Sequence, residues 1–494
     1  MSSIVSAFHL ARPEQVVMTS STRFIVAVVS LLLSVTDPLM AQDPALKTRI
    51  VATDLYVPWE LVWGPDNKIW ITELRGGIST IDPTTGEKNV LLADLPDRFQ
   101  LNESGLLGMV LHPQFADNPY VYIGYTYLIE QSIKLKVVRY RYDGSTLVEP
   151  FVLLGNIQGG PVHNGCRLAF GSDGMLYFTA GDGGNPEDAQ KLDFYNGKVL
   201  RINPNGSIPS DNPIPGSPLW TWGHRNSQGL TFGPNDVLYS SEHGATTDDE
   251  VNIIMKGRNY GWSRVEGLCN APGEIAFCAD SNVVEPIGTP WTPTIAPGAI
   301  KYYNSDLIPQ WKDHLLMTAM KQQATLVVME LSPDRSRIVS EQRLYRGVFG
   351  RLRSLCVSPD GRVFMGTTNR DVYGSPDQYP GSDHIIEITP QSSGVKERST
   401  SNAQQANVVF KITETQLTAF VTDVALFDRS PDRANASNQS SGVSLTITDV
   451  LGRVISEHGN GVGGFHIDIA HLTSGMYTAI VHTSSGAEAF TFVR

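Results

Sequence analysis

One local pattern recurs along the chain and limits the folds open to it. A short apolar strand runs into a turn of the Gly-Pro-Asp or Pro-Asp-Gly type, and a second, alternating apolar strand follows. Such turns between segments of period two are signals for antiparallel β-hairpins. The copies are LVWGPDNKIWITE (61–73), the degenerate MVLHPQFADNPYVYIGY (109–125), LAFGSDGMLYFTAGD (168–182), LTFGPNDVLYSSEHG (230–244) and LCVSPDGRVFMGTTN (355–369).

Hairpins repeated at intervals of tens of residues indicate the blades of a β-propeller, because one hairpin cannot bury both of its faces alone. The long, unequal loops between copies argue against a tight repeat family such as WD40. An array of β-sandwiches remains the alternative. The number of blades does not follow from the pattern. Almost no segment has the period of a helix, so we predict an all-β fold.

The N-terminus is typical of a secretory signal. Arg23 precedes the apolar run Phe24–Val35, and Leu-Met-Ala at 39–41, before Gln42, is read as the signal-peptidase site. The residues before Met18 show no regular pattern, which leaves Met18 as an alternative start. A transmembrane anchor is the competing interpretation, but the run is shorter than the ~20 apolar residues that a span requires. We therefore expect a cleaved signal peptide over 1–41, export, and no transmembrane anchor.

The composition changes near residue 390. Residues 42–390 carry the hairpin pattern and are assigned to the propeller. Residues 391–407, QSSGVKERSTSNAQQAN, are polar and predict a linker. Short alternating strands with Gly turns follow to the last residue, and they predict a separate small β-sandwich over 408–494.

The chain is acidic, with 38 Lys+Arg against 50 Asp+Glu and a formal net charge of −12. This balance argues against a nucleic-acid partner, which needs a basic face. Several basic side chains and histidines nevertheless stand beside short apolar strands with Gly-rich edges. If they converge, they form a cationic pocket suited to a small polyanion. The positions are His163, Arg225, His243, Lys321, Arg351 and Arg353.

One hairpin connects His163 to Asp182. Because a hairpin returns its two ends to adjacent positions, the Asp182 carboxylate can reach the imidazole and fix its tautomer. A histidine held by a carboxylate is an arrangement suited to a general base. The alternative is a histidine whose hydrogen bonds are merely satisfied within a turn.

The four cysteines fit an oxidising compartment. Cys269 and Cys278 share a loop with Pro and Gly and could close a small disulfide. Cys166 and Cys356 lie in apolar, strand-like runs and are expected to be buried thiols. The sequence has no CxxC pair, so a zinc site is not expected.

The ordered segments resemble the PQQ-dependent sugar dehydrogenases of the glucose/sorbosone dehydrogenase family, which includes soluble glucose and aldose sugar dehydrogenases. The resemblance covers roughly residues 48–390 and implies a six-bladed β-propeller with the cofactor on top of the blades. The segments that carry it are VPWELVWGPDNKIWITE, SGLLGMVLHPQFADNPYVYI, HNGCRLAFGSDGMLYFTAGDGG, NGKVLRINPNGSIPSDNP, WGHRNSQGLTF, SEHGATTDDEVNIIMKGRNYGW, PTIAPGAIKYY and GRLRSLCVSPDG.

The resemblance implies a role for each matching residue. His163 is the general base, Asp182 orients it, and Arg225 stabilises the oxyanion that develops when hydride arrives. Pyrroloquinoline quinone (PQQ) carries three carboxylates and an ortho-quinone, so it needs several fixed cations, and arginine offers bidentate geometry. The implied cofactor or site contacts are Arg225, Asn226, Thr294, Lys321, Arg351, Arg353 and, beside the substrate, Glu103.

Calcium is the second implied cofactor. Gly244 and Ala245 match the residues whose carbonyl oxygens bind a Ca²⁺ that also ligates the quinone and polarises it as a Lewis acid. Glu250 and Tyr260 match a structural calcium site of some members. The chain departs from the glucose enzymes around the substrate, which leaves the choice of sugar open. The departures are Glu103 for Gln, Val162 for Asp, Cys166 for Gly, Ala245 for Pro, Thr292 near a Trp position, and His243, which follows the aldose branch.

The last domain resembles the C-terminal sorting domain of type IX secretion cargo. The matching runs are DVLGRVI, FHIDIAHLTSGMYTAIV and the terminal FTFVR. The usual upstream Pro-Asn-Pro turn is absent or degraded at 430–432. An accessory or carbohydrate-binding sandwich is the alternative. The sorting interpretation implies the secretion machinery as a partner and passage through the periplasm to the cell surface or the medium.

Two function classes follow. The first is an exported, PQQ- and calcium-dependent dehydrogenase that oxidises an aldose at its anomeric carbon and passes electrons to an external acceptor. The second is a non-catalytic propeller that binds a ligand or a protein, since propellers host many binding functions. The complete set of His163, Asp182 and the four basic residues favours the enzyme, because a pure binding module has no reason to keep all of them.

Overall fold

The computed structural model describes most of the chain from residue 46 onwards. The predicted signal peptide and most of the predicted linker lie outside the described residues. These residues are 46–321, 324–374, 383–391, 407–412, 416–422, 444–449, 454–459, 465–468, 476–483 and 486–493.

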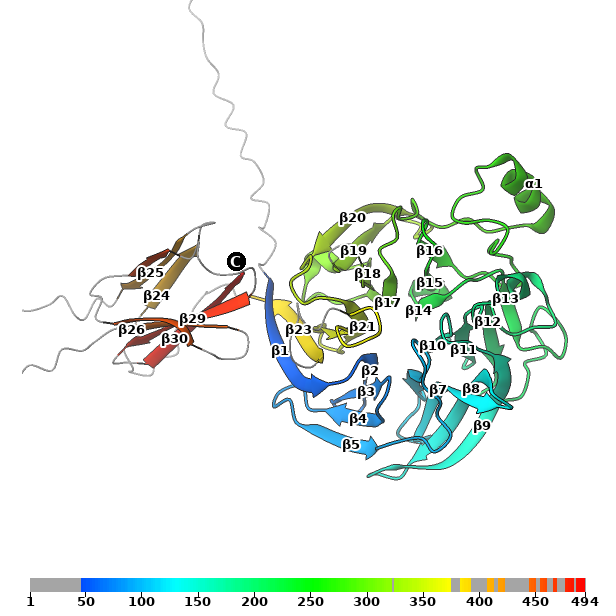
Figure 1. The fold of residues 1–494 in the computed structure, drawn as a ribbon, viewed down its shortest axis with the longest axis horizontal. Coiled ribbons are helices and arrows are strands. Elements are labelled where there is room, and N and C mark those ends of the chain that lie inside the picture. The colour runs from blue at the N-terminus through cyan, green and yellow to red at the C-terminus, as the bar shows by residue number, and fades with distance from the viewer. Residues whose placement is uncertain are drawn as a thin grey trace, which may run out of the picture. The chain divides into compact units, whose positions relative to one another are not determined.

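Within the described residues, six antiparallel sheets form the blades of a closed β-propeller (Figure 1). The innermost strands contact their neighbours in a complete ring around the centre. The predicted propeller is therefore confirmed over the sandwich array, and so is the blade number that the resemblance implied. The innermost strands are β2 (Pro58–Trp63), β6 (Leu106–Leu111), β10 (Gly165–Phe170), β14 (Ser227–Phe232), β17 (Pro297–Tyr303) and β21 (Leu352–Val357).

The blades follow one another along the chain, each starting at its innermost strand. The strands outside β2, β6 and β10 are β3 (Ile69–Glu73), β4 (Ile78–Ile81) and β5 (Lys88–Leu92); β7 (Tyr120–Ile129), β8 (Ser132–Tyr142) and β9 (Leu147–Gln158); and β11 (Leu176–Ala180), β12 (Lys198–Ile202) and β13 (Leu219–Trp222). Those outside β14, β17 and β21 are β15 (Leu238–Glu242) and β16 (Glu250–Ile253); β18 (His314–Ala319), β19 (Leu326–Leu331) and β20 (Ile338–Leu344); and β22 (Val363–Thr367), β23 (Asp383–Pro390) and β1 (Leu46–Leu55).

The ring is closed by strand β1. It pairs antiparallel with β23, from Leu46 opposite Pro390 to Leu55 opposite Asp383. The last blade therefore combines the beginning and the end of the propeller segment. This pairing removes the open edge that a linear row of blades would leave.

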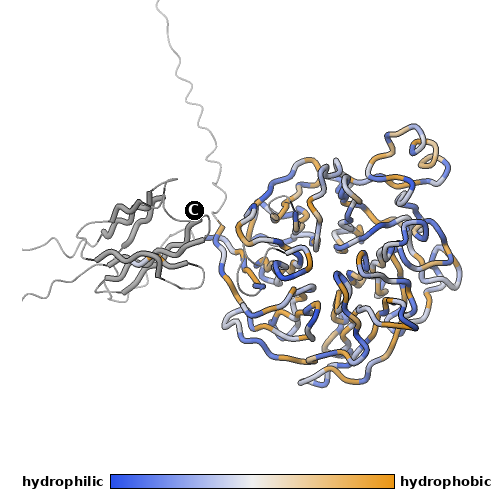
Figure 2. Tube along the Cα trace, viewed as in Figure 1, coloured by the Kyte–Doolittle hydropathy of each residue, from blue (hydrophilic) through white to orange (hydrophobic). Residues whose placement is uncertain are grey.

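Each of the five predicted hairpins is the innermost pair of strands in one blade. These strands are almost wholly buried, because neighbouring blades cover both of their faces; β3, β11, β15 and β22 have no exposed residue. Apolar stretches recur in every blade (Figure 2). The core thus consists of side chains packed between successive sheets.

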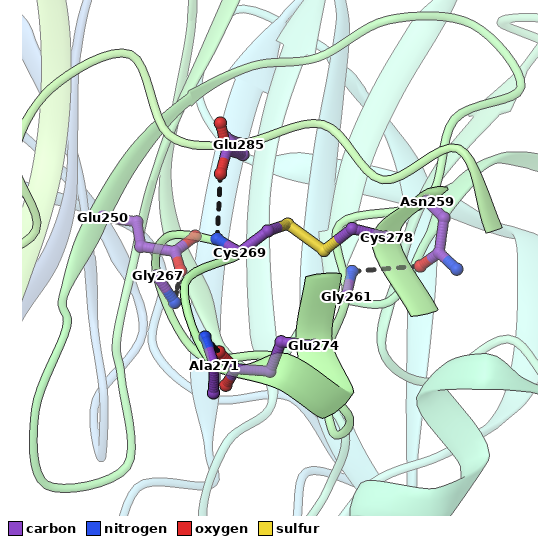
Figure 3. The surroundings of a disulfide bond; sticks show 9 residues. All are labelled: Glu250, Asn259, Gly261, Gly267, Cys269, Ala271, Glu274, Cys278 and Glu285. Atoms are coloured by element: carbon purple, nitrogen blue, oxygen red, sulfur yellow. Dashed lines mark hydrogen bonds between the residues drawn. A yellow bond between two sulfur atoms is a disulfide. The ribbon is translucent and has the colours of Figure 1, made fainter. Parts of the chain in front are cut away.

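Helices are short in the described part of the chain. One α-helix, α1 (Pro272–Ser281), stands in the loop after β16, and the 3-10 turns are η1 (Pro186–Gln190), η2 (Pro234–Asp236) and η3 (Pro309–Trp311). A disulfide joins Cys269 to Cys278 across the start of α1, as the sequence suggested (Figure 3). Cys166 and Cys356 are buried free thiols, which confirms that prediction too.

Two further sheets lie beyond residue 406. They have the orders β24-β25-β28 and β27-β26-β29-β30. The sandwich and its sorting role stay predictions, because the connecting segments lie outside the described residues. No helix in the described part of the chain is long and apolar enough to cross a membrane. The strands are β24 (Asn407–Ile412), β25 (Gln416–Thr422), β26 (Ser444–Asp449), β27 (Val454–Gly459), β28 (Phe465–Asp468), β29 (Met476–Thr483) and β30 (Gly486–Val493).

Candidate active site

The candidate residues share one position in the blade. They precede or begin an innermost strand, or they follow the second strand of the same hairpin. Because the two ends of a hairpin lie together, and because all blades point the same way around the ring, these positions meet on one face of the propeller. Before or within the innermost strands stand His163, Arg225, Asn226, Thr294, Arg351 and Arg353; after the second strands stand Asp182, Gly244, Ala245 and Lys321.

The His163–Asp182 pair forms as the hairpin predicted. The Nδ1 atom of His163 lies 2.9 Å from Oδ1 of Asp182. The Asp182 side chain is 1% exposed and that of His163 is 20% exposed, so solutes can reach the imidazole but not the carboxylate. Since the carboxylate accepts this bond, the proton stands on Nδ1, and Nε2 is the proton acceptor.

Glu103 lies against the same histidine. Its Oε2 accepts the backbone N–H of His163 at 3.1 Å, and its own N–H donates to the Pro161 carbonyl at 2.9 Å. Glu103 and Arg353 share a pocket with an empty volume of about 190 Å³, including space open to solvent. The other lining residues are Trp59, Leu107, Asn164, Gly165 and Gln228.

Arg225 and Asn226 precede β14. The Arg225 guanidinium lies 5.3 Å from the ring centroid of Trp262, and Nη1 donates to the His243 carbonyl at 3.4 Å. Its Nε is buried and has no hydrogen-bond partner among the described residues. The Asn226 Oδ1 accepts hydrogen bonds from Gly165 N and Gln228 Nε2. Its amide nitrogen is therefore the atom that can donate a hydrogen bond to a ligand.

The remaining cations form a second group. Lys321 Nζ donates to Thr294 Oγ1 at 3.3 Å. Arg351 and Arg353 both pair with Asp371, at 2.9 and 3.3 Å. Burial opposes ionisation of Asp371, but the two guanidinium groups hold the pKa of its carboxyl below the usual range. Two guanidinium groups share one carboxylate, so this part of the site keeps a net positive charge.

His243 lies close both to the residues around His163 and Arg225 and to the second group, which contains Arg353. Its Nε2 donates to the Pro297 carbonyl at 2.8 Å. Burial lowers the pKa of His243 well below the usual value, and the nearby charges of Arg225, Arg353 and His163 act in the same direction. The imidazole is therefore neutral, and it lies near Arg225, Arg353 and His163.

The backbone at Gly244 is fixed by Asp249, a residue that the sequence did not single out. Asp249 is fully buried and accepts the N–H groups of Gly244, Ile295 and Ala296. Burial raises the pKa of its carboxyl to about 6. A side chain at Gly244 would meet the Thr247 carbonyl at 1.7 Å, so the segment requires glycine there.

An acidic pocket adjoins Gly244 and contains both predicted structural-calcium residues. It has an empty volume of about 260 Å³, including space open to solvent. Its acidic lining residues are Glu242, Asp248, Glu250 and Glu266, and the others are Gly223, Arg225, His243, Gly244, Tyr260, Trp262 and Val265.

Glu250 and Tyr260 play different parts in this pocket. The Glu250 carboxylate accepts the N–H of Gly267 at 2.7 Å (Figure 3), and burial together with the charge of Glu242 raises its pKa to about 8. The Tyr260 hydroxyl is already bonded to Ile253 O and Met255 N. Among the described residues, no group of three or more His, Cys, Asp or Glu side chains is arranged to hold a metal ion. A cation here would therefore depend on backbone carbonyl oxygens such as those of Gly244 and Ala245.

Comparison with known proteins identifies the family of the chain. The family described as Glucose / Sorbosone dehydrogenase matches residues 55–373. The chain belongs to this family.

Quinoprotein glucose dehydrogenase B of Acinetobacter calcoaceticus is 31% identical over 69% of this chain and 89% of its own. Aldose sugar dehydrogenase YliI of Escherichia coli is 28% identical over 68% and 94%. The PQQ-bound aldose sugar dehydrogenase of Streptomyces coelicolor superposes with a TM-score of 0.61, at 31% identity, over 70% of this chain and 99% of that one. These matches confirm the family resemblance.

Proposed function

We propose that this member of the glucose/sorbosone dehydrogenase family is an exported, PQQ- and calcium-dependent dehydrogenase that oxidises an aldose at its anomeric carbon. The observation that carries the proposal is the convergence of the His163–Asp182 pair with Arg225, Arg351 and Arg353 on one face of the propeller. The names of two similar proteins, a quinoprotein glucose dehydrogenase and a PQQ-bound aldose sugar dehydrogenase, support it.

The residues present suit a polyanionic quinone. Arg225 carries a buried Nε without a partner, which a ligand oxygen would satisfy. Arg351, Arg353 and Lys321 add positive charge in an acidic chain, and carboxylates are the natural partners of guanidinium groups. We assign the quinone edge to Arg225 and Asn226, and the carboxylates to Lys321, Arg351 and Arg353, with Thr294 beside Lys321.

PQQ, when bound, supplies the quinone that accepts a hydride from the sugar. His163 takes the proton of the anomeric hydroxyl on Nε2, because its Nδ1 is committed to Asp182. The buried Asp182 carboxylate stabilises the imidazolium that results. The Arg225 guanidinium, which stacks on Trp262, is held ready to bind negative charge. Electrons leave to an external acceptor.

Calcium would be held by the Gly244 and Ala245 carbonyl oxygens. Asp249 fixes the Gly244 amide, so these carbonyls belong to a rigid segment. Oxygen donors are the ligands that Ca²⁺ prefers, and an adjacent cation would polarise a quinone oxygen. A structural cation near Glu250 and the Tyr260 backbone would also offset the excess of carboxylates in the acidic pocket.

Reconstitution tests the proposal. Purified protein given PQQ and Ca²⁺ is expected to oxidise members of an aldose panel with an artificial dye as acceptor. Exhaustive chelation is expected to abolish turnover, and added Ca²⁺ to restore it, because metal release removes the Lewis acid. Tight PQQ binding without oxidation of any aldose would instead identify a binding propeller. Failure to bind PQQ would overturn the cofactor assignment.

We propose further that the C-terminal domain directs the enzyme beyond the periplasm. Removing residues 408–494 is expected to leave an active dehydrogenase, because the polar segment 391–407 has few apolar residues to couple two cores. The truncated protein should accumulate in the periplasm, whereas the full chain should reach the cell surface or the medium. Cell fractionation with dye-linked activity measures both. Loss of activity with unchanged location would make this domain part of the enzyme.

A further inference from the structure

The Trp262 side chain contacts both Asp182 and Arg225, two residues of the candidate site. Its indole Nε1–H donates to Oδ2 of Asp182 at 2.9 Å. The face of the same ring lies 5.3 Å from the guanidinium carbon of Arg225. One side chain therefore connects the carboxylate behind the proposed base to the cation proposed to bind the quinone.

The tryptophan is held in place from two sides. Its backbone N–H donates to the Gly223 carbonyl at 3.0 Å. Its carbonyl accepts Nε2 of Gln190 at 2.6 Å, and Gln190 is itself paired with the Asn259 amide at 2.9 and 3.0 Å. The Trp262 backbone is thus fixed by two other segments of the chain, around Gly223 and Gln190, and this places the indole against Asp182.

The indole N–H competes with the imidazole for the negative charge of Asp182. Oδ1 of that carboxylate accepts His163 Nδ1–H and the Gly184 N–H, while Oδ2 accepts Trp262. A hydrogen bond to one carboxylate oxygen stabilises the anion and lowers its pull on a proton held by another donor. The indole bond therefore weakens the hold of Asp182 on the Nδ1 proton of His163.

We propose that Trp262 is a positioning residue with two effects. Through Asp182 it sets the protonation of His163, and the face of its ring orients the Arg225 guanidinium. This inference rests on the proposed function, since it assigns Trp262 to the proton-transfer and cofactor-binding steps of that reaction. The two roles use different parts of the side chain, the N–H and the ring. Substitutions can therefore separate them.

Trp262→Phe keeps an aromatic face and removes the N–H. We expect the acidic limb of the pH profile of kcat/KM to move to higher pH by about one to two units, which lowers kcat/KM at low pH by about 10- to 100-fold, the range for loss of a hydrogen bond to a charged group. PQQ affinity should change less than about threefold. Trp262→Leu also removes the ring and should weaken PQQ binding by a further ~3- to 30-fold, the usual worth of a cation–π contact.

Trp70→Phe is the matched control. Trp70 also donates its indole N–H to a carboxylate, Oδ1 of Asp66 at 3.0 Å, but it stands at the β2–β3 turn, at the opposite end of the hairpin from the site. This variant should keep the pH profile of the wild type. A second variant, Gln190→Met, removes the bond to the Trp262 carbonyl and should shift the acidic limb in the same direction by less.

A measurement that needs no turnover separates this inference from the proposed function. NMR titration of ¹⁵N-histidine-labelled protein, with the His163 signal assigned through His163→Gln, reports where that imidazole loses its proton. The midpoint should be higher in Trp262→Phe than in the wild type and in Trp70→Phe. Equal midpoints in all three proteins, and in Gln190→Met, would overturn the inference. A shifted midpoint in a protein that oxidises no aldose would support the link to Asp182 and reject the proposed function.

Discussion

Replacing His163 with glutamine is expected to lower kcat by about 10²–10⁴, the usual worth of general-base catalysis, while PQQ binding stays nearly intact. The glutamine amide can still donate to Asp182, so the carboxylate is not left unpaired. The imidazole Nε2, which is proposed to take the proton, is lost. Steady-state turnover with a dye acceptor gives kcat, and fluorescence titration of the protein with PQQ gives the affinity.

His314→Gln is the matched control for this variant. His314 begins β18 and is bonded through Nδ1 to the Lys312 carbonyl, at the end of the strand away from Lys321. The His314→Gln variant should have the kcat of the wild type. If His163→Gln lost cofactor affinity and rate in equal measure, His163 would be a structural or cofactor-binding residue and not the base.

The sequence predicted the innermost hairpin of five of the six blades, for a physical reason. An innermost hairpin is defined by a local turn and by strands buried on both faces. The turn residues and the apolar strand residues both lie within about fifteen consecutive positions of the sequence. The same locality predicted the contact of His163 with Asp182. The sixth hairpin, β17–β18, was not recognised as a copy because a longer loop containing η3 replaces the short turn.

What the sequence did not predict depends on contacts between distant segments. Trp262 and Asp182 are 80 residues apart, and nothing near the tryptophan marks it as a neighbour of Asp182. Asp371 follows β22 in a loop with no recognisable pattern, yet it pairs with both arginines. The closure of the ring by β1 joins residues more than three hundred positions apart, so no local pattern reveals it.

Replacing Arg353 with methionine is expected to lower PQQ affinity about 10²–10³-fold, in the range for truncating one partner of a buried, hydrogen-bonded charge pair. Arg353 is 7% exposed, and it donates to Gln228 Oε1 as well as to Asp371. Without it, Arg351 and Asp371 cancel each other, and the cluster of these three residues changes from net positive to neutral. The polyanion then loses both a bidentate donor and the field that attracts it.

Two further variants test whether the loss of PQQ affinity is due to the Arg353 guanidinium itself. Arg353→Lys keeps the charge without the planar fork and should fall between the wild type and Arg353→Met, since lysine cannot donate in bidentate geometry. Arg343→Gln removes an arginine paired with Glu341 on the outer strand β20 and should leave PQQ affinity unchanged. Affinity and thermal unfolding are measured together, because Arg353 is buried and its loss also costs stability. A folded Arg353→Met protein with wild-type PQQ affinity would show that the cofactor carboxylates bind elsewhere, whereas a graded loss across methionine and lysine would place them against Arg351 and Arg353.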